Sequence, residues 1–102
     1  MELNVRDRLI LLSILPQEGD FTTLKIVRQL REDLSFSEDD HKLLKFVQAD
    51  NQIAWNPEGD HIKKVEFKPK SSEIVANALK ELDKQKKLKE EHIDLYEKFV
   101  KE

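Results

Sequence analysis

The sequence contains no cysteine and very little glycine among its 102 residues. Without thiols the chain can form neither disulfides nor thiolate metal sites, and nothing indicates an oxidising compartment. Its two glycines, Gly19 and Gly59, both stand among turn-forming residues. A glycine-rich loop that binds phosphate is therefore excluded.

Long apolar runs and a large excess of one charge are also missing. No stretch approaches the roughly 18 apolar residues that a membrane span needs. The apolar segment from Leu9 to Leu15 is short, is interrupted by Ser13 and precedes Pro16 without a cleavage site, so we expect no signal peptide. We expect a cytoplasmic protein with no membrane partner. The net charge is −3 although 38% of the residues are charged, which indicates neither a basic nucleic-acid binder nor an acidic mimic.

The first third of the chain contains apolar residues at helical spacing. Asn4 is a candidate N-cap with Asp7 three residues later, and the following apolar residues predict a central, mostly buried helix. Pro16 ends this helix, because the residue before a proline is driven out of helical geometry. A second amphipathic helix is predicted from about residue 22 or 23 to residue 34.

A third helix is predicted to begin at Ser37. This residue can act as an N-cap, Asp40 stands at the reciprocal position, and the acidic residues between them favour the positive end of a helix dipole. Leu43, Leu44 and Val47 are expected to form its buried face.

Period-two alternation then predicts a β-hairpin. Its strands are expected at residues 52–55 and 61–67, joined by the turn-forming residues 56–60. Ile53 and Trp55 would share one face of the hairpin.

Helical spacing returns after Pro69, with a start at Ser71 or Ser72. The lysine-rich residues 84–89 carry almost no apolar side chains, so the segment 72–100 is either one long helix or two helices with a break near 87–90. We favour two, because a polar stretch without core contacts has little to keep it helical.

Together these elements predict one α+β domain, mainly α, over residues 1–102. Three helices and a two-stranded antiparallel hairpin would form a core over residues 1–70. The C-terminal helical segment, residues 71–102, would lie across that core.

The order of three helices followed by a hairpin resembles that of winged-helix domains. The chain is also similar to small proteins of unknown function encoded by tailed bacteriophages and prophages. The segments that carry this second resemblance are residues 3–12, residues 21–27, and His92 with residues 95–99. The resemblance implies an origin in a mobile element and an intracellular bacterial setting, and it implies no activity.

Nothing in the sequence predicts an enzyme. No serine stands in a nucleophile elbow, and His41, His61 and His92 lie on different elements without metal-ligand spacing. The acidic residues next to His41 are better explained as helix caps. We therefore expect no catalytic residues, no metal and no cofactor.

The leading functional hypothesis is a non-enzymatic protein–protein interaction module, acting in phage assembly or on a host protein. A C-terminal amphipathic segment could contact its own core, a second copy or a partner, and a tryptophan on the hairpin could be core or interface. The candidate protein-binding residues are Trp55, Ile93, Tyr96, Phe99 and Val100. A homo-oligomer is left open.

The alternative is a winged-helix-like transcription regulator or DNA-binding accessory protein. Its candidate nucleic-acid contacts are Lys25, Arg28, Arg31, Lys63, Lys64, Lys68 and Lys70. Against this hypothesis, the helix expected to enter the major groove begins with three acidic residues, which phosphates repel.

Overall fold

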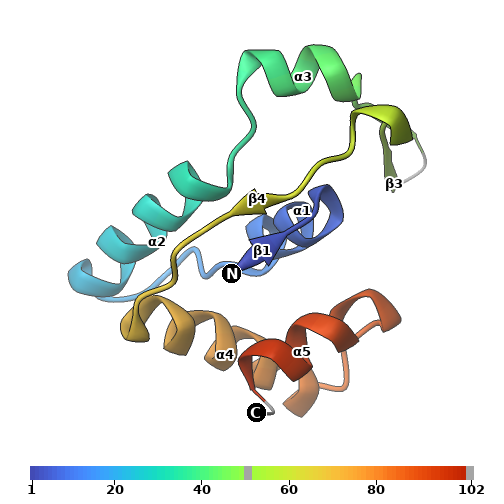
Figure 1. Cartoon of the computed structure of the whole chain (residues 1–102). Helices are drawn as coiled ribbons and strands as arrows, with labels where there is room; N and C mark the ends of the chain where they lie inside the picture. Colours follow the sequence, from blue (N-terminus) through green and yellow to red (C-terminus); the bar gives the residue numbers. More distant parts are fainter. Residues whose placement is uncertain (50–51, 101–102) are drawn as a thin grey trace.

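The computed structural model describes residues 1–49 and 52–100 of the chain. It confirms an α+β fold that is mainly helical, with five α-helices and short antiparallel strand pairs (Figure 1). The elements are β1 (Glu2–Leu3), α1 (Val5–Ile14), α2 (Phe21–Leu34), α3 (Glu38–Leu44), β2 (Val47–Ala49), β3 (Gln52–Ala54), η1 (Pro57–Gly59), β4 (Lys63–Lys64), α4 (Pro69–Lys84), η2 (Glu90–His92) and α5 (Ile93–Phe99).

The predicted helix caps are present at α1 and α3. The Asn4 side chain accepts a hydrogen bond from the Asp7 backbone N–H, and the Asp7 carboxylate accepts one from the Asn4 N–H. Ser37 and Asp40 form the same reciprocal pair at α3. The helix α2 begins slightly earlier than predicted, because Asp20 caps it through the Thr23 N–H.

Two helix boundaries differ from the prediction. The helix α4 starts at Pro69 rather than at the serines, since a proline has no N–H to lose at the first helical position. The helix α3 ends at Leu44 because Lys45 takes a left-handed conformation with φ 49°. The predicted inner face of α3 is confirmed only for Leu44, which is fully buried; Val47 lies in β2, and Leu43 is 57% exposed.

The pairing of the predicted hairpin is also wrong. The strand β3 pairs with β2, with Gln48 opposite Ile53, whereas β4 pairs with the N-terminal strand β1. The turn-forming residues between the predicted strands instead form η1, which Asn56 caps. The Met1 ammonium donates to the Val65 carbonyl at 2.9 Å and so extends the β1–β4 pairing. The partner of β4 is therefore β1, a strand at the start of the chain that the alternation pattern did not predict.

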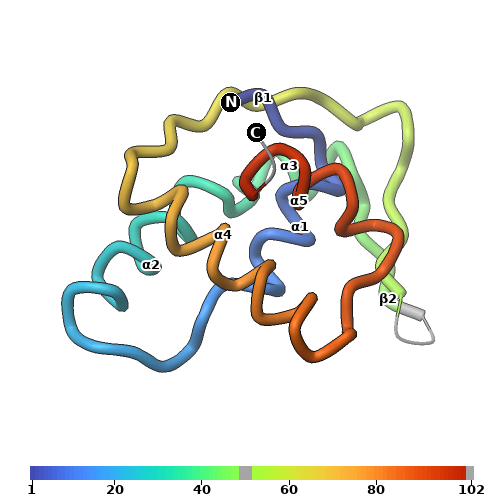
Figure 2. The backbone as a smooth tube through the Cα atoms, turned by 90° about the horizontal axis from the view of Figure 1, so that it is seen from below, coloured from blue at the N-terminus to red at the C-terminus, as the bar shows by residue number. Residues whose placement is uncertain are grey.

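The main core surrounds α1. Figure 2 shows α4 and α5 in front of α1, with α2 to one side. The core unites the two segments that the sequence separated, because α4 and α5 contribute buried residues beside those of α1 and α2. Its buried members are Leu3, Ile10, Leu11, Leu15, Val27, Leu30, Leu34, Val65, Val75, Leu79 and Leu95.

The C-terminal segment forms two helices, as favoured from the sequence. The helix α4 ends at Lys84, and Lys86 adopts a left-handed conformation with φ 59°. The Lys87 N–H closes the turn by donating to the Leu82 carbonyl at 2.8 Å. The chain then reverses, so that α5 packs against α4.

The elements α3, β2, β3 and η1 form a lobe apart from the main core, which we call the α3 lobe (residues 37–49 and 52–60). Figure 1 shows it at the opposite end of the molecule from α4 and α5. The helix α3 packs against η1, and Leu44 is the fully buried apolar residue of the lobe. The protein consequently exposes 7586 Å² of surface, against roughly 6,000 Å² expected for a compact chain of this mass.

Candidate functional site

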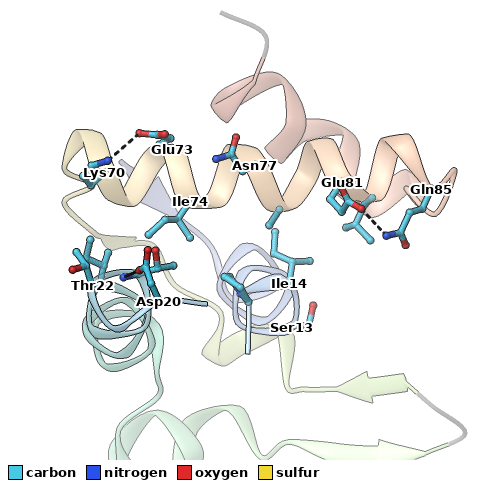
Figure 3. Close-up of a pocket in the computed structure, with 15 residues that line it drawn as sticks. Ser13, Ile14, Asp20, Thr22, Lys70, Glu73, Ile74, Asn77, Glu81 and Gln85 are labelled. Atoms are coloured by element: carbon cyan, nitrogen blue, oxygen red, sulfur yellow. Dashed lines mark hydrogen bonds and ion pairs between the residues drawn. The ribbon is translucent and has the colours of Figure 1, made fainter. Parts of the chain in front are cut away.

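An apolar groove of about 660 Å³ lies between α2 and α4, and the end of α1 forms its floor (Figure 3). The sequence of α4 explains this wall. Val75 and Leu79 enter the core with no exposed surface. The neighbouring row of α4, spaced four residues apart, faces the groove and consists of Ile74, Ala78 and Leu82. The apolar lining consists of Ile14, Pro16, Ile26, Ile74, Ala78 and Leu82.

Charged side chains border this α2–α4 groove. Three carboxylates, of Asp20, Glu73 and Glu81, and one ammonium, of Lys70, belong to its lining. Lys70 lies 3.9 Å from Glu73, and Gln85 donates to Glu81 at 2.9 Å, as the dashed lines in Figure 3 mark. The groove is thus apolar inside and net negative at its edge.

Asp20 stays ionised at this edge. The backbone N–H of Thr23 donates to its carboxylate and holds the pKa of Asp20 below its ordinary value. The Thr23 side chain and the charge of Lys70 lower this pKa further. One residue therefore both caps α2 and provides a fixed negative charge beside the groove.

A second apolar surface lies on α2, away from the groove. Phe21 is 81% exposed and Leu24 is 37% exposed. Arg28 follows Leu24 by four residues and therefore lies on the same side of the helix. We call this surface the outer face of α2, and define it by Phe21, Leu24, Lys25, Arg28, Arg31 and Glu32. It carries three cations and one carboxylate, so its charge is opposite to that of the groove edge.

The predicted C-terminal binding residues divide between core and surface. Tyr96, Phe99 and Val100 pack against the main core, which is one of the alternatives left open by the sequence. Phe99 meets the ring of Phe67 edge-on, with centroids 5.1 Å apart. Ile93 is 49% exposed on the first turn of α5.

Trp55 belongs to the α3 lobe, on the side that faces α1. Its indole N–H donates to Asp60 at 3.3 Å, and its ring meets Phe46 edge-on. With Ile53 it lines a hollow of about 670 Å³ whose opposite wall is α1. The shared face predicted for Ile53 and Trp55 is therefore directed at α1, although polar and charged side chains make up much of this hollow.

The predicted nucleic-acid contacts do not gather at one place. Lys25, Arg28 and Arg31 belong to the outer face of α2, while a separate hollow contains Lys63, Lys64 and Lys68 beside Gln29, Asp33 and Glu66. Two of the lysines are engaged within the chain. The Lys63 ammonium donates to the Asp33 carbonyl at 2.7 Å, and Lys70 pairs with Glu73.

Arg8 is the residue that the sequence analysis missed. It is fully buried although it was not assigned to the inner face of α1. Its Nε donates to the Leu34 carbonyl at 3.1 Å, a terminal nitrogen donates to the Ser35 carbonyl, and the guanidinium carbon lies 3.9 Å from the Phe36 ring centroid. Its place three residues from both Val5 and Leu11, about one turn from each of these core residues, could have indicated burial.

A small charged network surrounds this arginine. The Nη2 atom of Arg8 lies 3.8 Å from Oδ2 of Asp40, and Oδ1 of Asp40 lies 3.4 Å from Nε2 of His61. Burial lowers the pKa of Arg8 from its ordinary value, and Asp40 opposes this shift. The Ser37 backbone N–H lowers the pKa of Asp40, and the charges of His61 and Arg8 contribute to the same direction. The network joins α1 to the start of the α3 lobe.

Within residues 1–49 and 52–100, no three His, Asp or Glu side chains are grouped in a way that could hold a metal ion. Nor does any helix there combine the length and apolar character required to cross a bilayer.

The fold and surfaces define a small α+β domain with an apolar groove and an oppositely charged helix face. No protein-family model, curated protein sequence or solved structure matches the chain.

Proposed function

We propose that this protein is a non-enzymatic protein-interaction module whose α2–α4 groove binds an amphipathic segment of a protein. The observation that carries the proposal is the groove itself: an apolar interior, open to solvent, bordered by charged side chains. Apolar interiors with a polar edge are typical of surfaces that accept the apolar face of a helix.

The size of the groove suits side chains rather than a whole domain. Three helices provide its apolar walls, and α4 borders it from Lys70 to Gln85. That span corresponds to about 22 Å of helix at the usual rise per residue. A bound helix could bury two or three large apolar side chains, each contributing roughly 1.5–3 kcal/mol before the entropic cost of association.

The biological setting rests on the resemblance to phage and prophage proteins. On that basis we propose a role in assembly or in modulation of a host protein. DNA binding gains no specific support, because the seven basic residues considered for it are divided among three surfaces and two of them are engaged within the chain.

The experiment is an amide NMR titration with a 15-residue helical peptide that carries leucine along one side and lysine and alanine elsewhere. We expect saturable shifts in amides of Ile14, Thr23, Ile74 and Leu82, which border the groove. Ala78→Trp should abolish them by filling the groove. Lys80→Trp is the matched control, because Lys80 is exposed on α4 outside the groove.

The proposal would be contradicted if the peptide caused no shifts, or if it caused the same shifts in the Ala78→Trp variant as in the wild type. A parallel titration with a DNA duplex at two salt concentrations tests the alternative, since phosphate contacts weaken steeply with salt.

A further inference from the structure

Two surfaces stay open to solvent in the part of the chain that the structure describes, and they are complementary. The α2–α4 groove is apolar with three carboxylates and one ammonium at its edge. The outer face of α2 is an amphipathic helix side with two exposed apolar residues, three cations and one carboxylate. One surface is concave and net negative, and the other is convex and net positive.

The most exposed large apolar side chain of the described residues belongs to the convex surface. Phe21 has 81% of its surface in solvent, an unusual position for a residue type that normally buries most of its area. Leu24 follows three residues later, and Arg28 four residues after that, which is the spacing of a helix that docks into a groove.

We infer that the α2–α4 groove of one copy accepts the outer face of α2 from a second copy of this chain. Phe21 and Leu24 of that second copy would enter the apolar interior. Its Lys25 and Arg28 would lie toward Glu73 and Glu81 at the edge. The inference rests on the proposed function, because it names the partner of the same groove.

The geometry makes this contact head-to-tail. The outer face does not line the groove of its own molecule, although α2 is one of the groove walls. Phe21, Leu24 and Arg28 lie on one side of α2, whereas the groove residues Thr22, Thr23 and Ile26 lie on the opposite side. One pair of copies therefore cannot make both contacts at once. Such a heterologous contact leaves a free groove at one end and a free α2 face at the other, so that copies add to each other as an open chain or a closed ring.

Single-surface variants can separate the two halves of the contact. Phe21→Asp removes the apolar anchor, and aspartate is favourable in the first turn of a helix, so the variant should fold. Ala78→Trp fills the groove and leaves the outer face intact. Ile93→Asp is the control, because Ile93 is 49% exposed and belongs to neither surface.

The measurement is sedimentation velocity from about 10 μM to about 1 mM, the range in which a small interface associates. Wild type and Ile93→Asp should form species larger than a dimer as concentration rises. Phe21→Asp and Ala78→Trp should each remain monomeric. An equimolar mixture of these two variants should form a one-to-one dimer and nothing larger, because it contains one functional groove and one functional α2 face per pair.

Charge supplies a second readout. Glu81→Lys should weaken the association of the wild-type chain about tenfold, as expected for reversal of an edge charge. Raising the salt concentration should weaken the association of the wild type more than that of the Glu81→Lys variant.

A wild-type chain that stays monomeric throughout, or a mixture of the two variants that does not dimerise, would overturn the inference. If the helical peptide still binds the groove in that case, the proposed function stands and the partner is a different protein. If the peptide fails as well, both are wrong. Self-association that persists in Phe21→Asp would assign the contact to another surface.

Discussion

At the scale of single residues, the buried Arg8 joins the two parts of the molecule. It links α1 to the end of α2 and to Phe36, which precede the α3 lobe. Its Nη1 has no hydrogen-bond partner in the described part of the chain. Hydrogen bonds and the aromatic ring stabilise the buried charge, so removing the side chain should lower the free energy of unfolding strongly.

We predict that Arg8→Ala lowers the free energy of unfolding by about 3 kcal/mol, because two carbonyls lose their donor, Asp40 loses its ion-pair partner and a cavity remains. Arg6→Ala, which removes an exposed arginine from the same helix, should cost less than about 0.5 kcal/mol. Urea denaturation measures both. Equal effects of the two substitutions would contradict the role assigned to Arg8.

The two glycines allow a further residue-scale prediction. A Cβ on Gly59 would lie 2.7 Å from the Leu43 carbonyl oxygen, where the backbones of η1 and α3 meet. A Cβ on Gly19 would meet only the Thr23 side chain, at 3.4 Å. Gly59 thus permits the close approach that forms the α3 lobe.

Gly59→Ala should therefore lower the free energy of unfolding by about 1–3 kcal/mol, because backbone cannot yield as a side chain can. Gly19→Ala should be neutral or stabilising by up to about 1 kcal/mol, since its φ is not positive and alanine restricts the unfolded chain. Urea melts followed by the fluorescence of Trp55 provide the measurement. A destabilisation by Gly19→Ala as large as that by Gly59→Ala would refute the clash.

At the scale of elements, α5 completes the core rather than extending from it. Leu95 has no exposed surface, and His92 is 6% exposed at the helix start, where its Nδ1 accepts the Lys89 N–H. The Tyr96 hydroxyl donates to Asp83 on α4, at 3.3 Å. This short helix therefore holds its place through tertiary contacts, since seven residues have little helical stability of their own.

We predict that Leu95→Ala lowers the free energy of unfolding by about 2–5 kcal/mol, the usual cost of a cavity at a fully buried leucine. Ile93→Ala, on the same helix but half-exposed, should cost about 1 kcal/mol or less. Thermal and urea denaturation of the matched pair distinguish them. If both substitutions are nearly silent, α5 does not belong to the core in solution.

At the scale of the whole molecule, the protein exposes more surface than a compact chain of its mass. Its 7586 Å² of accessible area exceeds by about a quarter the value expected for a compact 12 kDa chain. The α3 lobe stands apart from the main core, and the α2–α4 groove stays open between packed helices. Unfilled apolar surface of this kind favours association, and this is the physical basis for placing the function in contacts with other chains.

The sequence determined the helical elements, because their information is local. Caps at Asn4 and Ser37, the end of the first helix before Pro16 and the existence of a polar break in the C-terminal segment all depend on residues within a turn or two. The break itself begins after Lys84, a few residues before the predicted 87–90. The α+β class and the mainly helical content followed from these elements.

Only the tertiary structure decided the strand partners, the burial of Arg8 and the α2–α4 groove. The strand β4 pairs with β1 across about sixty residues of sequence, and a pattern of alternation does not say which distant strand completes it. The groove consists of residues that read as ordinary helix faces in three separate segments. Whether such a face is buried or left open depends on how far apart the packed helices lie, and no local pattern of side chains fixes that distance.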